Sequence, residues 1–158
     1  MSAQVTQRVT PEHTAWVGLL RAHASTTRRF NAELVAEHGL TLNDYEVLLH
    51  LSRAEGQRLR RVDLVERVLL TPSGITRLLG GLECAGYVER ASCDADARVT
   101  YAQLTAAGES KLRQAAETHV SGIREFFRGR FSDDELRALG GLLERLPLDA
   151  ARESSCEP

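Results

Sequence analysis

The spacing of hydrophobic residues along the chain predicts a protein built mainly from helices. Apolar residues recur at intervals of three and four in several long segments, as in helices that bury one face. The first such segment begins near Thr10 and ends at Gly39, and the second is entered through Thr41. Two more occupy the C-terminal part, one beginning near Thr105 and one after the capping residue Ser132.

Between these long segments, residues 59–84 predict two short helices joined by a tight turn. The first, LRRVDLVERVLL, places Val62, Val65 and Leu69 on its inward side. Thr71 is a good N-cap and Pro72 suits the first position of the second helix, which Gly86 can end. Its inward stripe consists of Ile75, Leu78, Leu79 and Leu82. This arrangement is typical of a helix-turn-helix.

The outward face of the second helix carries groups suited to nucleic acid. Ser73, Thr76 and Arg77 lie near its N-terminus, where they can reach phosphates and base edges. Arg77 is the best candidate for reading sequence, because a guanidinium can bond both major-groove acceptors of guanine. Gly80 and Gly81 cost helix stability but permit close approach to a DNA backbone, and simple tolerance of glycine explains them equally well.

Residues 87–104 predict a two-stranded hairpin. Tyr87 and Val88 start one strand, Val99 and Tyr101 mark the other, and the segment between them is rich in turn-forming residues. The predicted fold is therefore mainly α with a small β-hairpin wing, a winged helix-turn-helix flanked by N- and C-terminal helices.

The loop and exit of this hairpin resemble the MarR family of bacterial regulators. Residues 96–98 read D-A-R and residues 104–108 read L-T-A-A-G, which are similar to that family's D-x-R and L-T-x-x-G patterns. The resemblance implies that Arg98 enters the minor groove and that Asp96 holds it by an ion pair. A narrow minor groove concentrates negative potential that attracts such an arginine.

The resemblance covers about residues 10–147 and suggests a division of the chain. Residues 1–40 would be an N-terminal dimerisation helix, 41–108 the DNA-binding domain, 109–147 C-terminal dimerisation helices and 148–158 a disordered tail. The long amphipathic helices carry more apolar surface than the small winged domain can cover, so a partner chain is expected. The resemblance implies an identical subunit and a pseudopalindromic DNA operator with half-sites roughly 10 base pairs apart.

The distribution of charge matters more than its sum. The net charge of the chain is −2, which by itself argues against a protein that binds phosphates. Residues 53–98 nevertheless hold eight arginines against seven acidic residues, whereas the segments on either side are acidic. We therefore expect weak non-specific DNA binding and a reliance on a few well-placed cations.

The sequence also indicates the cellular compartment of the protein and the kinds of chemistry it does not carry out. No apolar run approaches the roughly 20 residues of a membrane span, and the N-terminus lacks an apolar signal core, so a cytoplasmic protein is expected. Cys84, Cys93 and Cys156 form no C-x-x-C pair, and the histidines form no H-x-x-x-H pair, so we expect neither disulfide nor metal. Motifs of enzymes and of cofactor binding are missing, and we expect neither catalysis nor a cofactor.

The resemblance also implies a signal that releases the protein from DNA. The resemblance implies that a small phenolic or aromatic anion binds between the helical region and the winged domain, with Trp16, His23, His50 and His119 as candidates. The favoured alternative is that Trp16 anchors the dimer core and that His23 and His119 are satisfied interface histidines.

Two other functions stay open at this point. Cys84 or Cys93 could make the protein a redox sensor, although peroxide sensors of the family carry their cysteine near the start of the first long helix, where this chain has none. A winged domain can also serve as a protein-docking module, because fold does not fix function.

Overall fold

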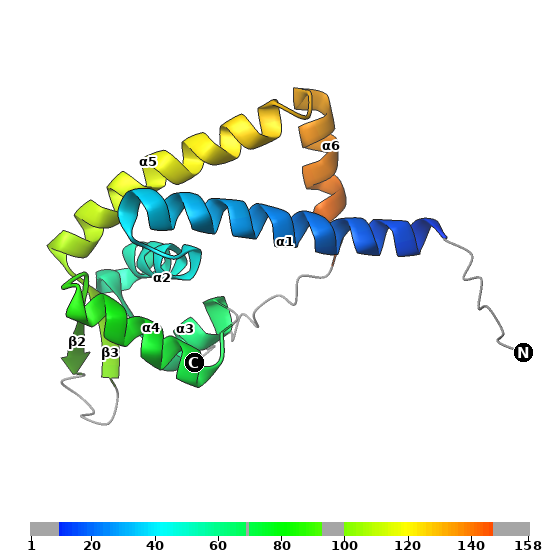
Figure 1. The fold of residues 1–158 in the computed structure, drawn as a ribbon. Coiled ribbons are helices and arrows are strands. Elements are labelled where there is room, and N and C mark those ends of the chain that lie inside the picture. Colours follow the sequence, from blue (N-terminus) through cyan, green and yellow to red (C-terminus); the bar gives the residue numbers. More distant parts are fainter. Residues whose placement is uncertain (1–9, 69, 93–99, 147–158) are drawn as a thin grey trace, which may run out of the picture.

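The computed structural model describes residues 10–68, 70–92 and 100–146, and its longest elements form a helical arm. Helix α1 (Pro11–His38) contacts α5 (Ala106–Arg128) near one end, and the two helices diverge toward the other end (Figure 1). There α6 (Asp133–Leu143) turns back from α5 toward α1. The remaining helices, which lie beside the near end of the arm, are α2 (Leu42–Arg53), α3 (Arg61–Val68) and α4 (Pro72–Cys84). The predicted fold class is confirmed.

Capping residues explain why these helices begin and end where they do. The Thr10 hydroxyl accepts a hydrogen bond from the His13 N–H, and α1 ends at Gly39, whose φ of 65° suits glycine. Thr41 with Asp44 caps α2, and Ser132 with Glu135 caps α6 in the same reciprocal arrangement. The predicted helix starts are thus confirmed by side-chain hydrogen bonds.

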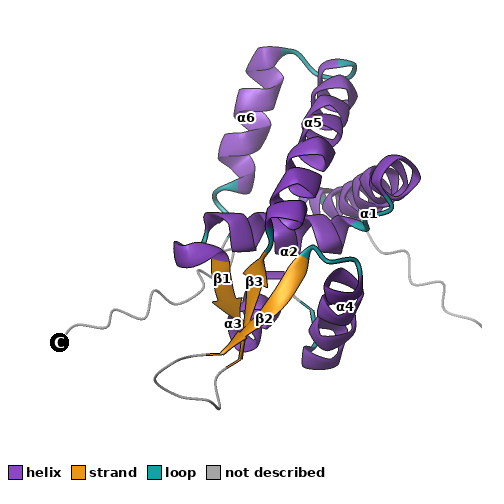
Figure 2. Cartoon of the chain, turned by 90° about the vertical axis from the view of Figure 1, so that its left-hand side faces the viewer, coloured by secondary structure: helices purple, strands orange, loops and turns teal. Residues whose placement is uncertain are grey.

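The wing belongs to a three-stranded antiparallel sheet, which corrects the prediction of an isolated two-stranded hairpin. The strands β1 (Arg58–Arg60), β2 (Val88–Ser92) and β3 (Thr100–Leu104) lie in the order β1-β3-β2 (Figure 2). Arg60 pairs with Tyr101, and Val88 pairs with Leu104. Because β1 is three residues long, its existence depends on pairing with β3, which no local pattern reveals.

The first helix of the helix-turn-helix also differs from its prediction. It begins at Arg61 rather than at Leu59, since Leu59 and Arg60 belong to β1. Its buried residues are Leu64 and Val68, whereas Val62 is 62% exposed. An eight-residue helix with apolar residues on two sides can bury either side, and the contacts with neighbouring elements select the Leu64 side. Leu69 lies outside the described residues.

The core lies in the winged domain and at its junction with the arm. The buried cluster joins residues from α1, α2, α3, α4, α5 and the sheet, and its fully buried members include Leu34, Val47, Leu48, Leu51, Leu64, Ile75 and Leu79. The N-terminal half of α1 is almost entirely exposed, and no residue of α6 is buried. The far end of the arm is therefore apolar surface that no other part of residues 10–68, 70–92 and 100–146 covers.

Candidate nucleic-acid interface

Helix α4 is held at both ends by local interactions. The Thr71 hydroxyl accepts a hydrogen bond from the Gly74 N–H at 3.1 Å, and Pro72 occupies the first turn. At the other end Gly86 has a φ of 75°, and the Tyr87 N–H donates to the Leu82 carbonyl at 2.9 Å. Both predicted boundaries of this helix are confirmed.

The two faces of α4 divide as predicted between core and surface. Ile75, Leu79 and Leu82 are buried, which fixes the rotation of the helix about its axis. Ser73, Thr76, Arg77 and Cys84 are exposed on other sides. The side chains offered to DNA therefore project from a helix whose orientation the core determines.

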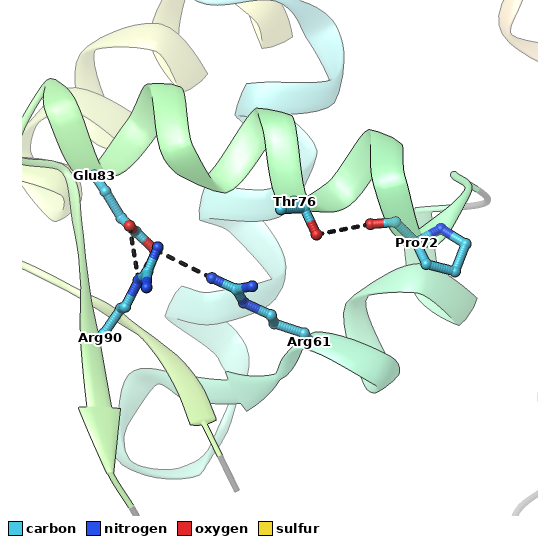
Figure 3. A network of polar contacts seen from close by, with 5 residues as sticks. All are labelled: Arg61, Pro72, Thr76, Glu83 and Arg90. Carbon is cyan, nitrogen blue, oxygen red and sulfur yellow. Dashed lines mark hydrogen bonds and ion pairs between the residues drawn. The ribbon is translucent and has the colours of Figure 1, made fainter. Parts of the chain in front are cut away.

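The hydroxyls near the start of α4 are already engaged within the protein. Thr76 donates its hydroxyl proton to the Pro72 carbonyl at 2.9 Å (Figure 3), and Ser73 shares a hydrogen bond with Thr71 at 3.2 Å. Thr76 can still accept a hydrogen bond from a base amino group, such as that of adenine or cytosine, but it has no proton left to donate. Among the described residues Arg77 forms no ion pair, so its five N–H groups can serve as donors.

A polar network ties α4 to the two elements beside it. Glu83, on the last turn of α4, binds Arg90 of β2 at 2.9 Å and lies 3.7 Å from Arg61 at the start of α3 (Figure 3). The Glu83 carboxylate raises the pKa of Arg90 further above its ordinary value. Sequence reasoning missed this network, because Glu83 and Arg61 are distant in the chain and only the fold brings them together.

We expect Glu83→Gln to weaken DNA binding more than it weakens folding. The ion pairs are partly exposed and screened by solvent, so their loss should lower the free energy of unfolding only slightly. The wing strand would however lose its ionic tie to α4, and operator affinity should fall severalfold. Urea unfolding and fluorescence anisotropy with labelled operator measure the two effects.

Arg137→Gln, which breaks the exposed pair with Asp134 on α6, is the matched control. Equal operator affinity in wild type and Glu83→Gln would contradict this role.

The described strands of the wing end at the pair Ser92 and Thr100. The predicted clamp residues Asp96 and Arg98, and the thiol of Cys93, lie outside the described residues. On α4 itself, a Cβ added at Gly80 or Gly81 would meet no atom within 4 Å. Packing within the chain thus places no demand on these two glycines, and both explanations of them stay open.

The L-T-A-A-G segment after the wing has a clear structural role. The Thr105 hydroxyl donates to the Gly86 carbonyl at 2.7 Å and accepts from the Gly108 N–H at 3.0 Å, so it caps α5 and holds the end of α4. A Cβ at Gly108 would collide with the Tyr87 carbonyl and lie 2.8 Å from Leu104 Cδ1. This segment therefore fixes α4, the wing and the arm relative to one another.

The four predicted ligand residues lie in different surroundings. Trp16 is 58% exposed on the outer half of α1. His23 lines an apolar hollow between α1, the end of α5 and α6. His50 is half-buried beside Arg53 and Arg67, which together with burial lower its pKa. The structure does not gather these residues into one pocket.

His119 of α5 has the most unusual environment of the four. Its ring contacts Tyr45 and Phe30, with centroid separations of 4.8 and 5.4 Å. Its Nδ1 atom is buried and has no hydrogen-bond partner among the described residues. Burial lowers the pKa of His119, and the Glu33 carboxylate partly offsets this effect. The alternative that His119 is a satisfied interface histidine involves a partner subunit and stays a prediction.

We expect stability to fall as the pH drops below 6.5, the ordinary pKa of histidine. A histidine whose pKa is lowered by folding binds fewer protons in the folded than in the unfolded state, so acidification favours unfolding. His50 contributes with the same sign. Burial raises the pKa of Glu46, so protonating this carboxyl as the pH falls toward 4.5 relieves the cost of burying its charge and opposes the trend there. Urea unfolding between pH 5 and 8 should show a smaller slope for His119→Phe than for wild type. His13→Gln, on the exposed start of α1, should keep the wild-type slope; a His119→Phe slope equal to wild type would contradict the assignment.

Other candidate chemistries find limited support in the described residues. Cys84 is exposed on α4, and Cys156, like Cys93, lies outside them. No group of three metal-binding side chains comes together in residues 10–68, 70–92 and 100–146. None of the described helices is long and apolar enough to cross a membrane.

An exposed polar helix, anchored between a second short helix and a β-wing, defines a winged helix-turn-helix DNA-binding protein. Comparisons with known proteins identify the family. Residues 38–99 match the family model described as MarR family. The chain is 34% identical over 115 residues to the transcriptional repressor YetL of Bacillus subtilis, covering 70% of this chain and 68% of that protein. The chain belongs to the MarR family of transcriptional regulators, which bind DNA and are not enzymes.

Solved structures of the same family show the same architecture. AbsC of Streptomyces coelicolor superimposes with a TM-score of 0.77 and 31% identity, covering 88% of this chain and 94% of that one. Sco3205 of the same organism, solved in complex with DNA, has a TM-score of 0.78 and 25% identity, covering 90% of this chain and 89% of that one. Membership of this family favours DNA binding over a protein-docking role.

Proposed function

We propose that this protein is a homodimeric, sequence-specific repressor that acts in the cytoplasm and leaves a pseudopalindromic operator when a small phenolic or aromatic anion binds. The main support for sequence-specific DNA binding is that Ser73, Thr76 and Arg77 are exposed on α4, whose other face is buried in the core. The wing supplies a second contact through Arg98, oriented by Asp96. The DNA complex of Sco3205 and the repressor function of YetL support this reading.

Selection of binding sequences from random DNA tests the proposal directly. Purified full-length protein should enrich a pseudopalindrome with half-sites roughly 10 base pairs apart, as expected for two recognition helices one DNA turn apart. A search of the genome around the gene for the recovered motif would then identify the target promoter. Failure to enrich any sequence at physiological salt would count against sequence-specific regulation.

The proposed dimer rests on apolar surface at the far end of the arm. Leu142, Leu143 and Leu146 are 57%, 40% and 45% exposed, and Trp16 is exposed on α1. A hollow of about 550 Å³ between α1, α5 and α6 is lined largely by apolar groups, among them Leu19, Phe127, Phe131 and Leu139. Surface of this kind on a soluble domain marks an association site, and a second copy presents the same complementary helices.

We expect Leu143→Glu to dissociate the dimer. Leu143 lines the apolar hollow, and burying an unpaired carboxylate against a partner subunit is costly, so the dissociation constant should rise at least about tenfold. Sedimentation velocity at micromolar concentration measures the change. Arg145→Glu, an equally exposed charge change just beyond α6, is the control. A wild-type protein that sediments as a monomer would refute the dimer itself.

The junction of α1, α2 and α5 is the best-supported place for the ligand. The rings of Phe30 and Tyr45 pack against His119 there, and the Nδ1 of His119, which has no hydrogen-bond partner among the described residues, is the group left to bond a phenolate or carboxylate. Trp16, His23 and His50 would contribute only through the partner subunit or at separate sites.

Redox control is the second candidate, because Cys84 is exposed on the DNA-reading helix, where oxidation would alter contact with DNA.

A further inference from the structure

A hollow of about 770 Å³ opens at the edge of the sheet that faces away from α4. It lies where the end of α2 passes through a short turn (Glu55–Gln57) into β1, which is the outer strand on this side (Figure 2). Residues from α2, the turn, β1, α3 and β3 line it, among them Arg53, Glu55, Arg58, Leu59, Arg67 and Tyr101. We call it the arginine hollow.

The charge of this hollow is largely uncompensated. Ion pairs in the described part of the chain engage Arg29, Arg60, Arg61, Arg90 and Arg137, and none of them involves the three arginines of the hollow. Glu55 is the single acidic side chain in the lining. Burial lowers the pKa of the neighbouring His50, and the charges of Arg67 and Arg53 lower it further. Like charges held around one space repel each other, and an anion between them would relieve that repulsion.

The shape of the hollow favours a small organic anion over an ion alone. Its volume is within the range of small-molecule sites, far larger than a phosphate group. Arg58 stacks on the Tyr101 ring at 5.1 Å, which orients its guanidinium, and Leu59 with Tyr101 provides apolar wall. Arginine binds carboxylates and phosphates through paired hydrogen bonds, so three of them suit a multiply charged group.

The position of the hollow separates it from the DNA-reading surface. Arg58 pairs with Gln103 at the end of β3 farther from the wing loop, and β1 lies on the opposite side of the sheet from β2 and α4. An occupant would touch α2, β1, α3 and β3 together, which include the first helix of the helix-turn-helix and one strand of the wing. We propose that the arginine hollow binds a small anionic metabolite, a phosphate monoester or a polycarboxylate, through Arg53, Arg58 and Arg67.

Titration of the full-length protein with inorganic phosphate, followed by NMR in chloride buffer near physiological ionic strength, tests this site. We expect saturable shifts of the His50 imidazole and Tyr101 ring signals. The double variant Arg53→Gln/Arg67→Gln should bind phosphate at least about tenfold more weakly, since it loses two charge-assisted contacts. The matched control Arg113→Gln/Arg124→Gln removes two exposed arginines of α5 and should bind phosphate as wild type does.

The proposal stands apart from DNA recognition, and its failure can be told from a failure of the proposed function. Shifts that grow linearly without saturation, or equal affinity in both double variants and wild type, would overturn it. A third result would also overturn it: phosphate binding is not saturable, and Arg53→Gln/Arg67→Gln loses affinity for long operator fragments but not for short ones. The arginines would then contact flanking DNA. Unchanged operator affinity of that variant, together with weakened phosphate binding, supports the small-anion site.

Discussion

Arg77→Ala should lower affinity for the selected operator by about 10- to 100-fold and relax the preference for one base pair in each half-site. The reason is geometric: Arg77 projects from the exposed face of α4, while the buried Ile75 and Leu79 fix the rotation of the helix. A bidentate contact from arginine to guanine contributes roughly 1–3 kcal/mol of discrimination. Fluorescence anisotropy on the operator and on a set of single-base variants measures both effects.

Two other arginines sharpen this test. Arg113→Ala, on the exposed surface of α5, should leave operator affinity unchanged. Arg98→Ala in the wing should weaken binding to all sequences alike and reduce the salt dependence by about one unit of slope for each subunit of the dimer, as for an arginine attracted by the groove potential. If Arg77→Ala left both affinity and base preference intact, α4 would not be the reading helix of this protein.

Gly108→Ala should destabilise the protein by about 1–3 kcal/mol or more, the usual cost of forcing a group into a packed site. The added methyl would meet the backbone carbonyl of Tyr87 and the side-chain Cδ1 of Leu104, so the backbone at Tyr87 and the start of α5 would have to move apart. Because Thr105 bonds both Gly86 and Gly108, the same shift would disturb the end of α4. Urea unfolding at one fixed protein concentration measures the loss, since dimerisation would make stability depend on concentration.

Gly81→Ala is the matched control for this substitution. Gly81 is an exposed position within α4, and an added methyl would have no described atom within 4 Å. Alanine should therefore raise the free energy of unfolding by up to about 1 kcal/mol through its greater helix propensity. A Gly108→Ala protein as stable as wild type would show that the junction of wing and arm is looser than the contacts of Gly108 indicate.

Local chemistry made much of the interface predictable. The limits of α4 follow from Thr71, Pro72 and Gly86, whose preferences act within one turn of helix, and the structure confirms them. The inward stripe of α4 was predictable because its apolar residues lie on one side. The face of α3 was predicted only in part: Val65 packs against the core as predicted, but Val62 is exposed, because the sequence offers apolar residues on both sides of a helix only eight residues long.

Contacts between segments distant in the chain could not be predicted from the sequence. Glu83 meets Arg61 and Arg90 only after α3, α4 and β2 have packed together, and the strand β1 exists only because β3 lies beside it. The arginine hollow likewise combines residues from four elements, none of which is unusual in its own segment.

The sequence by itself determined the helices, their caps, the exposed reading residues and the family pattern, because hydrophobic periodicity and capping act over a few neighbouring residues. The tertiary structure decided which face of α3 is buried and how Glu83 connects α4 to the wing. It also decided why Gly108 can carry no side chain and where arginines without ion-pair partners lie close together. These features depend on distances between segments far apart in the chain, and only packing sets those distances.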